Sequence, residues 1–103
     1  MKAFEIIING EAYPCSMTMG AFIDFKEVTG TDLSKADMTS ISDNATFMWC
    51  VVRSSCRKNK REFNYTLNDF CDNVDMETLA TFQLLLAENM GDYQKKMTEK
   101  KTS

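Results

Sequence analysis

The dipeptide Asn9-Gly10 constrains the fold of this chain more than any other feature of its sequence. Apolar runs flank it on both sides, and Asn-Gly in that setting favours a type I′ turn, whose two central residues need positive φ. Residues 3–19 are therefore predicted to form a β-hairpin. Because an isolated hairpin is only marginally stable in water, its apolar face must dock on the rest of the chain.

A two-residue turn also fixes the register of the strands. The predicted pairs are Ile8 with Glu11, Ile6 with Tyr13, and Phe4 with Cys15. One face then carries Phe4, Ile6, Tyr13 and Cys15, and the other carries Glu5, Ala12 and Pro14. Pro14 has no N–H to donate, so it predicts an edge strand or a strand irregularity.

Four segments with apolar residues at helical spacing follow the hairpin, at about 19–29, 42–58, 67–73 and 76–90. Gly30 stands where a C′ glycine ends a helix, and Thr66 and Asp75 stand where N-caps begin one. The stretch FMWCVV inside 42–58 is apolar all round and also fits a buried strand. The compatible pattern continues well past eight residues, which favours a helix.

The predicted fold class is α+β, mostly α, with an N-terminal β-hairpin packed on three to four helices. A chain of 103 residues has room for one domain. We expect a single globular domain over 1–91, followed by a polar, flexible tail over 92–103.

Composition excludes several kinds of chemistry. The chain contains no histidine, which removes imidazole bases and imidazole metal ligands. Its four glycines are scattered at turns and form no phosphate-binding loop. The acidic residues Asp69, Asp72, Asp75 and Glu77 lack the ligand spacing of a calcium loop, so helix capping explains them better. We expect no enzyme, no metal and no cofactor.

The four cysteines form no Cys-x-x-Cys pair, which disfavours a zinc site. Neither a signal peptide nor a run of about 18 apolar residues is present, so we expect a cytoplasmic protein without membrane contact. In a reducing compartment the thiols should be free and mainly structural. One alternative is a reactive Cys56, since Arg57 and Lys58 follow it and cations lower a thiol pKa.

The densest basic patch comprises Arg53, Arg57, Lys58, Lys60 and Arg61. It could contact phosphates, as in a small nucleic-acid-binding or regulatory module. Cations also gather at helix C-termini because the helix dipole favours them there. A net charge of −3 argues against a surface built for nucleic acid, so the nucleic-acid function is the alternative.

Apolar residues near the end of the last predicted helix indicate a surface for a protein partner. Met90 closes that helix beside Leu85 and Leu86, and methionine suits adaptable contacts. The predicted partner-binding residues are Phe82, Leu85, Leu86 and Met90.

The order of these segments resembles the small tail assembly chaperones of long-tailed bacteriophages and prophages. In that family a strand-turn-strand unit runs into a helix of the form G-A-x-x-x-F/L-E-x-x-T-G. The matching positions here are Asn9, Gly10, Tyr13, Gly20, Ala21, Phe25, Glu27, Thr29 and Gly30. The later segments ATFMWCVVRSSCR and EFNYTLNDFCDNV, and the final amphipathic helix, extend the resemblance over residues 3–90.

The resemblance implies a non-enzymatic assembly factor. Such chaperones bind the tape-measure protein, help to recruit the tail tube protein, and are absent from the finished virion. The partners expected from the resemblance are therefore these two proteins in the bacterial cytoplasm. A homo-oligomer also stays open.

Overall fold

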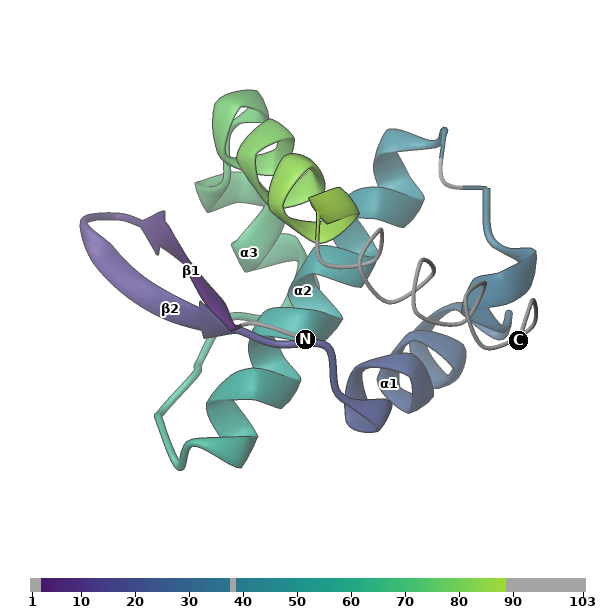
Figure 1. Ribbon diagram of the computed structural model, residues 1–103, viewed down its shortest axis with the longest axis horizontal. Coiled ribbons are helices and arrows are strands. Elements are labelled where there is room, and N and C mark those ends of the chain that lie inside the picture. Colours follow the sequence, from purple (N-terminus) through teal and green to yellow (C-terminus); the bar gives the residue numbers. More distant parts are fainter. Residues whose placement is uncertain (1–2, 38, 89–103) are drawn as a thin grey trace, which may run out of the picture.

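The computed structural model describes residues 3–37 and 39–88. A two-stranded antiparallel sheet, β1 (Phe4–Ile8) and β2 (Glu11–Cys15), precedes helix α1 (Met19–Thr29). A short 3₁₀ turn η1 (Leu33–Lys35) leads to helices α2 (Ile41–Lys58) and α3 (Leu67–Asn73). Residues 76–88 are also helical and are called the C-terminal helix below. The predicted fold class, α+β and mostly α, is confirmed (Figure 1).

The hairpin has the predicted register. Asn9 and Gly10 adopt φ values of 53° and 81°, as a type I′ turn requires. The paired residues are Phe4 with Cys15, Ile6 with Tyr13, and Ile8 with Glu11. The side chains of Ile6, Ile8, Tyr13 and Cys15 are buried, whereas Glu5 and Ile7 are exposed. The alternation of the two faces therefore follows from the turn.

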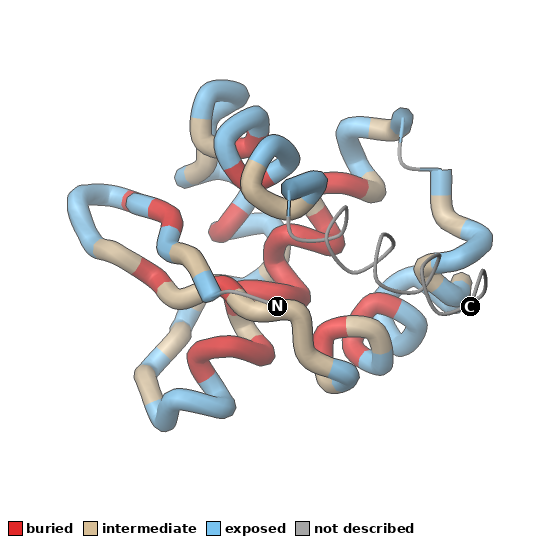
Figure 2. Tube along the Cα trace, viewed as in Figure 1, coloured by how far each residue is buried: buried red, intermediate tan, exposed pale blue. Residues whose placement is uncertain are grey.

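Helix α2 forms the centre of the core. Residues 46–52 are all buried, and Figure 2 shows the buried stretch running along this helix. The apolar run FMWCVV is thus helical, as its length predicted. It lacks helical periodicity because the hairpin, α1, α3 and the C-terminal helix together cover residues 46–52 in the middle of α2.

Two buried serines of α2 hold the segment that leaves the hairpin. The Ser16 amide donates to Ser55 Oγ at 2.8 Å, and Ser55 Oγ in turn donates to the Val51 carbonyl at 2.7 Å. Thr18 Oγ1 lies 2.6 Å from Ser54 Oγ. Buried polar atoms need such partners, so these bonds fix where the hairpin ends and α1 begins. We call the contacts of Ser54 and Ser55 with Ser16 and Thr18 the serine seam.

Gly20 lets α1 approach this seam. A Cβ placed on Gly20 would lie 2.8 Å from Ser54 Oγ and 3.1 Å from Arg57 Nη2. The next residue, Ala21, is completely buried. Two small residues at the start of α1 therefore set the distance between α1 and α2, which explains this part of the G-A-x-x-x-F pattern.

The predicted helix ends are confirmed. Gly30 adopts φ 78° and donates its N–H to the Lys26 carbonyl, which ends α1 in a left-handed cap. Thr66 Oγ1 accepts from the Asp69 amide at the start of α3. Asp75 Oδ1 accepts from the Thr78 amide at 2.7 Å, and this capping bond lowers the Asp75 pKa. Residues 89–90 of the last predicted helix and the predicted tail 92–103 lie outside the described residues.

The hairpin docks through aromatic side chains and through its turn. Phe4 packs against Phe82 of the C-terminal helix with 6.0 Å between ring centroids. The side-chain Nδ2 of Asn9 donates to Tyr65 Oη and to Asn73 Oδ1, and these bonds connect the turn to the end of α3. The Trp49 indole N–H donates to the Tyr65 carbonyl at 3.0 Å. The apolar face of the hairpin is thereby covered, as it needs to be.

Gly20→Ala tests the close approach of α1 to the serine seam. Alanine gains up to about 1 kcal/mol in helix propensity, yet its Cβ collides with Ser54 Oγ. We expect a net loss of about 1–2 kcal/mol in the free energy of unfolding, measured by urea denaturation. In a Ser54→Ala background, which lacks the Ser54 Oγ, Gly20→Ala should lower the free energy of unfolding only slightly. An equal cost in both backgrounds would contradict the proposed collision.

Candidate functional site

The main candidate site is an open apolar groove of about 790 Å³. It is formed by the segment before α1, by α1, η1, α2 and the end of the C-terminal helix. We call it the apolar groove; its lining residues are Met17, Phe22, Asp32, Leu33, Ser34, Asn44, Phe47, Gln83, Leu86 and Ala87.

The floor of the groove is a continuation of the core. The rings of Phe22 and Phe47 stack nearly parallel, at 24°, with their centroids 6.1 Å apart. Phe47 is buried, while Phe22 is only half-buried and presents its remaining surface to the groove. Met17, Leu33 and Leu86 are likewise partly exposed and packed against the core. Apolar surface that a fold leaves accessible in a concave site is typical of a binding site.

One rim of the groove carries charge. Asp32, the one charged residue among the described lining residues, lies 3.4 Å from Lys26 Nζ, and both side chains are more than half exposed. A smaller hollow of about 350 Å³ shares Phe22 and Asp32 with the groove and extends to Ile23 and Glu27 on α1. Ile23 is 57% exposed. The apolar surface thus continues along α1 beside a mixed ionic rim.

The three described residues among the four predicted partner-binding residues do not form one surface. Phe82 was predicted wrongly, because its side chain is completely buried between Phe4 and Phe47. Leu86 lines the apolar groove, whereas Leu85 is half-buried and does not. Met90 lies outside the described residues. Helical periodicity located the apolar face of the helix but not the part of that face which the hairpin covers.

Most of the groove could not be predicted from the sequence. Phe22 and Phe47 lie in the predicted helices 19–29 and 42–58, Met17 lies in the predicted hairpin, and Leu33 lies between predicted elements. The connection 31–40 instead forms η1, which places Leu33 opposite Phe22 and Phe47. The one local signal is a single leucine in an otherwise polar stretch, TDLSKADMTS.

The basic patch is divided by intramolecular contacts. Arg53 and Arg57 share a face of α2, as their spacing predicted, and that face meets Asp24 of α1. Their Nη2 atoms lie 3.1 and 3.3 Å from the same Asp24 Oδ2. The Asp24 side chain is 9% exposed, and Arg53 also lies over the Trp49 ring at 4.0 Å. Both arginines are therefore already paired with a carboxylate of this chain.

Arg61 is turned toward the hairpin. Its guanidinium donates to the Ala12 carbonyl, lies 3.4 Å from Glu11 Oε2 and covers the Tyr13 ring at 4.2 Å. Tyr13 donates to the same Glu11 oxygen, and burial with this hydrogen bond raises the pKa of Tyr13 to about 12. These side chains line a polar hollow of about 700 Å³ between β2 and α3.

Lys58 and Lys60 are exposed and make no ion pair within the described part of the chain. Two free lysines make a weak phosphate-binding surface, because the three arginines beside them are engaged elsewhere.

The cysteines are free, and three of the four are buried. Burial raises the pKa of both the Cys15 and the Cys50 thiol to about 12, and it also raises that of Cys56. Arg61, rather than the neighbours Arg57 and Lys58, lowers the Cys56 pKa, and burial outweighs it. Cys71, in α3, is exposed and does not contribute to the core.

Among residues 3–37 and 39–88, no three side chains of metal-binding type come together. A search of the same residues finds no helix with the length and apolarity to cross a bilayer. Comparison with family models, with curated proteins and with solved structures yields no match.

Native thiol reactivity tests whether Cys56 could act as a nucleophile. At pH 8 we expect one thiol, Cys71, to react with an aromatic disulfide reagent, and the other three only on unfolding. In Cys71→Ser no thiol of the native protein should react promptly. Rapid modification of Cys56 in the folded variant, located by mass spectrometry, would contradict this expectation.

Asp24→Ala tests the ion pairs between α1 and α2. The change leaves Arg53, which has a buried Nε with no hydrogen-bond partner, without its carboxylate. We expect the free energy of unfolding to fall by about 1–3 kcal/mol. The control Asp32→Ala breaks an exposed pair with Lys26 and should cost less than about 1 kcal/mol. Equal losses of unfolding free energy in Asp24→Ala and Asp32→Ala would show that the buried ion pairs are not more stabilising than the exposed one.

Proposed function

We propose that this chain is a non-enzymatic phage tail assembly chaperone that binds the tape-measure protein, the tail tube protein or both. The proposal rests on the resemblance of residues 3–90 to that family. The confirmed order of hairpin and helices is consistent with it. The observation that carries it furthest is the apolar groove, which supplies a place for a protein partner.

The groove suits an amphipathic helix of the partner. Helix-in-groove recognition requires a hydrophobic trough that accepts apolar side chains spaced three or four residues apart. The groove offers apolar surface from Phe22, Phe47 and Leu86. Apolar side chains of the partner that become buried against such surface contribute most of the binding energy at protein interfaces. Asp32 on the rim would favour a basic residue at the edge of the bound helix.

The side chains that line the groove also suit reversible binding. Three lining residues stay partly exposed, and one of them, Met17, has an unbranched, flexible side chain that can adapt to different apolar side chains; the other two are Leu33 and Leu86. A single helix seated here buries a modest area, which is typical of transient complexes. A chaperone that leaves the assembled particle needs binding of this strength.

The alternative, a nucleic-acid-binding module, depends on the basic patch. Three of the five residues in that patch contact Asp24, Glu11 or the Ala12 carbonyl within the chain. Their engagement favours the protein-binding proposal. Nucleic-acid binding would show itself by a steep loss of affinity with added salt.

Ala87→Trp tests the groove without removing a core contact. Ala87 is exposed and lines the groove, so a tryptophan there should occupy the space that the partner needs. We expect at least about tenfold weaker binding to a phage tape-measure or tail tube protein, measured by biolayer interferometry. Co-purification from co-expressing cells should fall in parallel.

Ala80→Trp is the matched control. Ala80 is exposed on the same helix, two turns earlier, and does not line the groove. It should bind as the unchanged chain does, with an unaltered circular dichroism spectrum. The chaperone proposal fails if the unchanged chain binds neither protein, and the groove is the wrong surface if Ala87→Trp binds normally.

A further inference from the structure

The two outer edges of the hairpin differ. In an antiparallel pair, residues alternate between positions whose N–H and C=O bond to the partner strand and positions whose groups point away from it. The two-residue turn makes Ile8–Glu11 a hydrogen-bonded pair, and Ile6–Tyr13 follows as the next. The pairs Glu5–Pro14 and Ile7–Ala12 therefore direct their backbone groups outward.

The β2 edge is closed at both of its outward positions. Pro14 has no N–H to offer. The outward carbonyl of Ala12 accepts from the Arg61 guanidinium, which is itself held over the Tyr13 ring and beside Glu11. A further strand on this side would have to displace Arg61. Proline and charged side chains are the usual means of protecting an edge strand.

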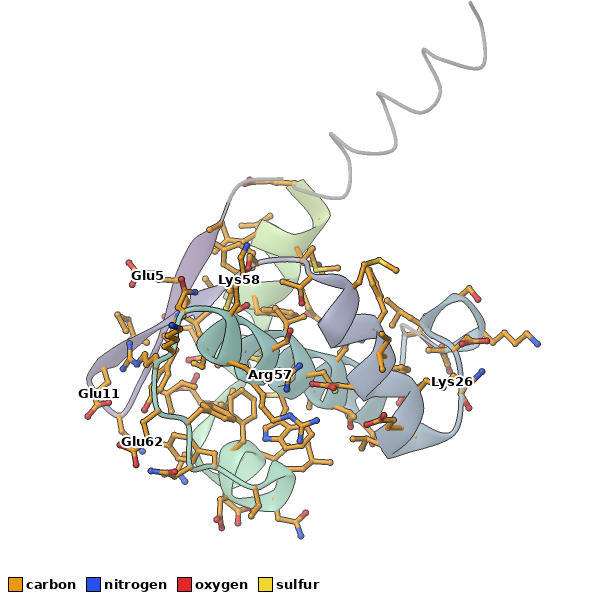
Figure 3. All side chains as sticks on the ribbon, turned by 90° about the horizontal axis from the view of Figure 1, so that it is seen from below. Glu5, Glu11, Lys26, Arg57, Lys58 and Glu62 are labelled. Carbon is orange, nitrogen blue, oxygen red and sulfur yellow. The ribbon has the colours of Figure 1, made fainter. Side chains whose placement is uncertain are left out.

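The β1 edge has no such protection in the described part of the chain. The backbone groups of Glu5 and Ile7 point away from β2, and no hydrogen bond from residues 3–37 or 39–88 reaches them. Both side chains are exposed, and Ile7 is 58% exposed despite its size and branching. Figures 1 and 3 show the hairpin at one end of the molecule, with helices over one face only.

We propose that the β1 edge accepts an extended, basic segment of another polypeptide as a third strand. The N–H and C=O of Glu5 and Ile7 would supply four backbone hydrogen bonds, as in other cases of strand addition. Opposite Glu5 the segment carries a lysine or arginine, and opposite Ile7 a β-branched residue. This inference does not depend on the apolar groove or on the chaperone assignment.

Charge selects a basic segment over a second copy of this chain. The two strands carry Glu5 and Glu11 and no cation, so pairing β1 with β1 of a second copy would leave Glu5 without an opposite charge in any register, whereas a basic segment supplies one.

The test uses the full chain and a fluorescein-labelled peptide of eight alternating lysine and valine residues. We expect measurable fluorescence polarisation on titration with the unchanged chain. Ile7→Pro removes an outward N–H that β2 does not use, just as Pro14 does on the other strand, so the hairpin should survive. Peptide binding should fall at least about tenfold, whereas Ile7→Val, which keeps the N–H, should change it less than about twofold.

Two further measurements separate backbone pairing from general charge attraction. N-methylation of alternate peptide residues should abolish binding for one set of residues and spare it for the other, because only one set of amides faces β1. Glu5→Lys should reverse the preference, so that an alternating glutamate–valine peptide binds better than the basic one.

Three results would overturn the proposal. The first is that the basic peptide does not bind the unchanged chain. The second is that Ile7→Pro, with a native circular dichroism spectrum, binds the peptide as well as Ile7→Val does. The third is a dimer, detected by sedimentation, that Ile7→Pro abolishes, because the occupant of the edge would then be a second copy. None of these results bears on binding in the apolar groove.

Discussion

The burial of residues 46–52 in the middle of α2 is the constraint on which the rest of this structure depends. A helical stretch that is apolar all round has to be surrounded, and a chain of 103 residues has few elements with which to surround it. Each element is therefore placed by its contact with α2. The serine seam supplies the polar side of this arrangement, because Ser54 and Ser55 are buried and bind the segment that joins the hairpin to α1.

The candidate site is a consequence of the same packing. Gly20 and Ala21 bring the start of α1 close to α2, while the connection 31–40 spans the open side through η1. The part of Phe22 that remains uncovered, stacked on the buried Phe47, becomes the floor of the apolar groove. The residues that resemble the chaperone family, Gly20, Ala21 and Phe25 among them, hold this geometry and do not line the groove.

Features governed by neighbouring residues could be predicted from the sequence. Asn9-Gly10 determined the register, and Thr66, Asp75 and Gly30 marked the helix ends, because turns and caps depend on a few adjacent residues. Features that join distant segments could not be predicted. Phe82 was predicted to contact a partner, because the sequence does not show that Phe4 of the hairpin covers it. The spacing of the basic patch likewise does not show that Asp24 of α1 pairs with its arginines.

The groove escaped prediction for the same reason. It is assembled from five segments, and none of them shows by itself that it will stay uncovered. Leu33 is the clearest example, since its role depends on η1 facing two phenylalanines from different helices. Helical periodicity identifies the apolar face of each helix, but it does not show which parts of those faces the other elements leave uncovered.

The central claim is that the apolar groove is the surface that binds a tail protein. Its most direct test is a ¹⁵N-resolved NMR titration of the full chain with the tape-measure protein, or with overlapping segments of it. The account predicts the largest shift changes at Phe22, Leu33 and Leu86, and small changes at Lys58 and Lys60. Shift changes concentrated on the two lysines, with the groove residues unaffected, would contradict it.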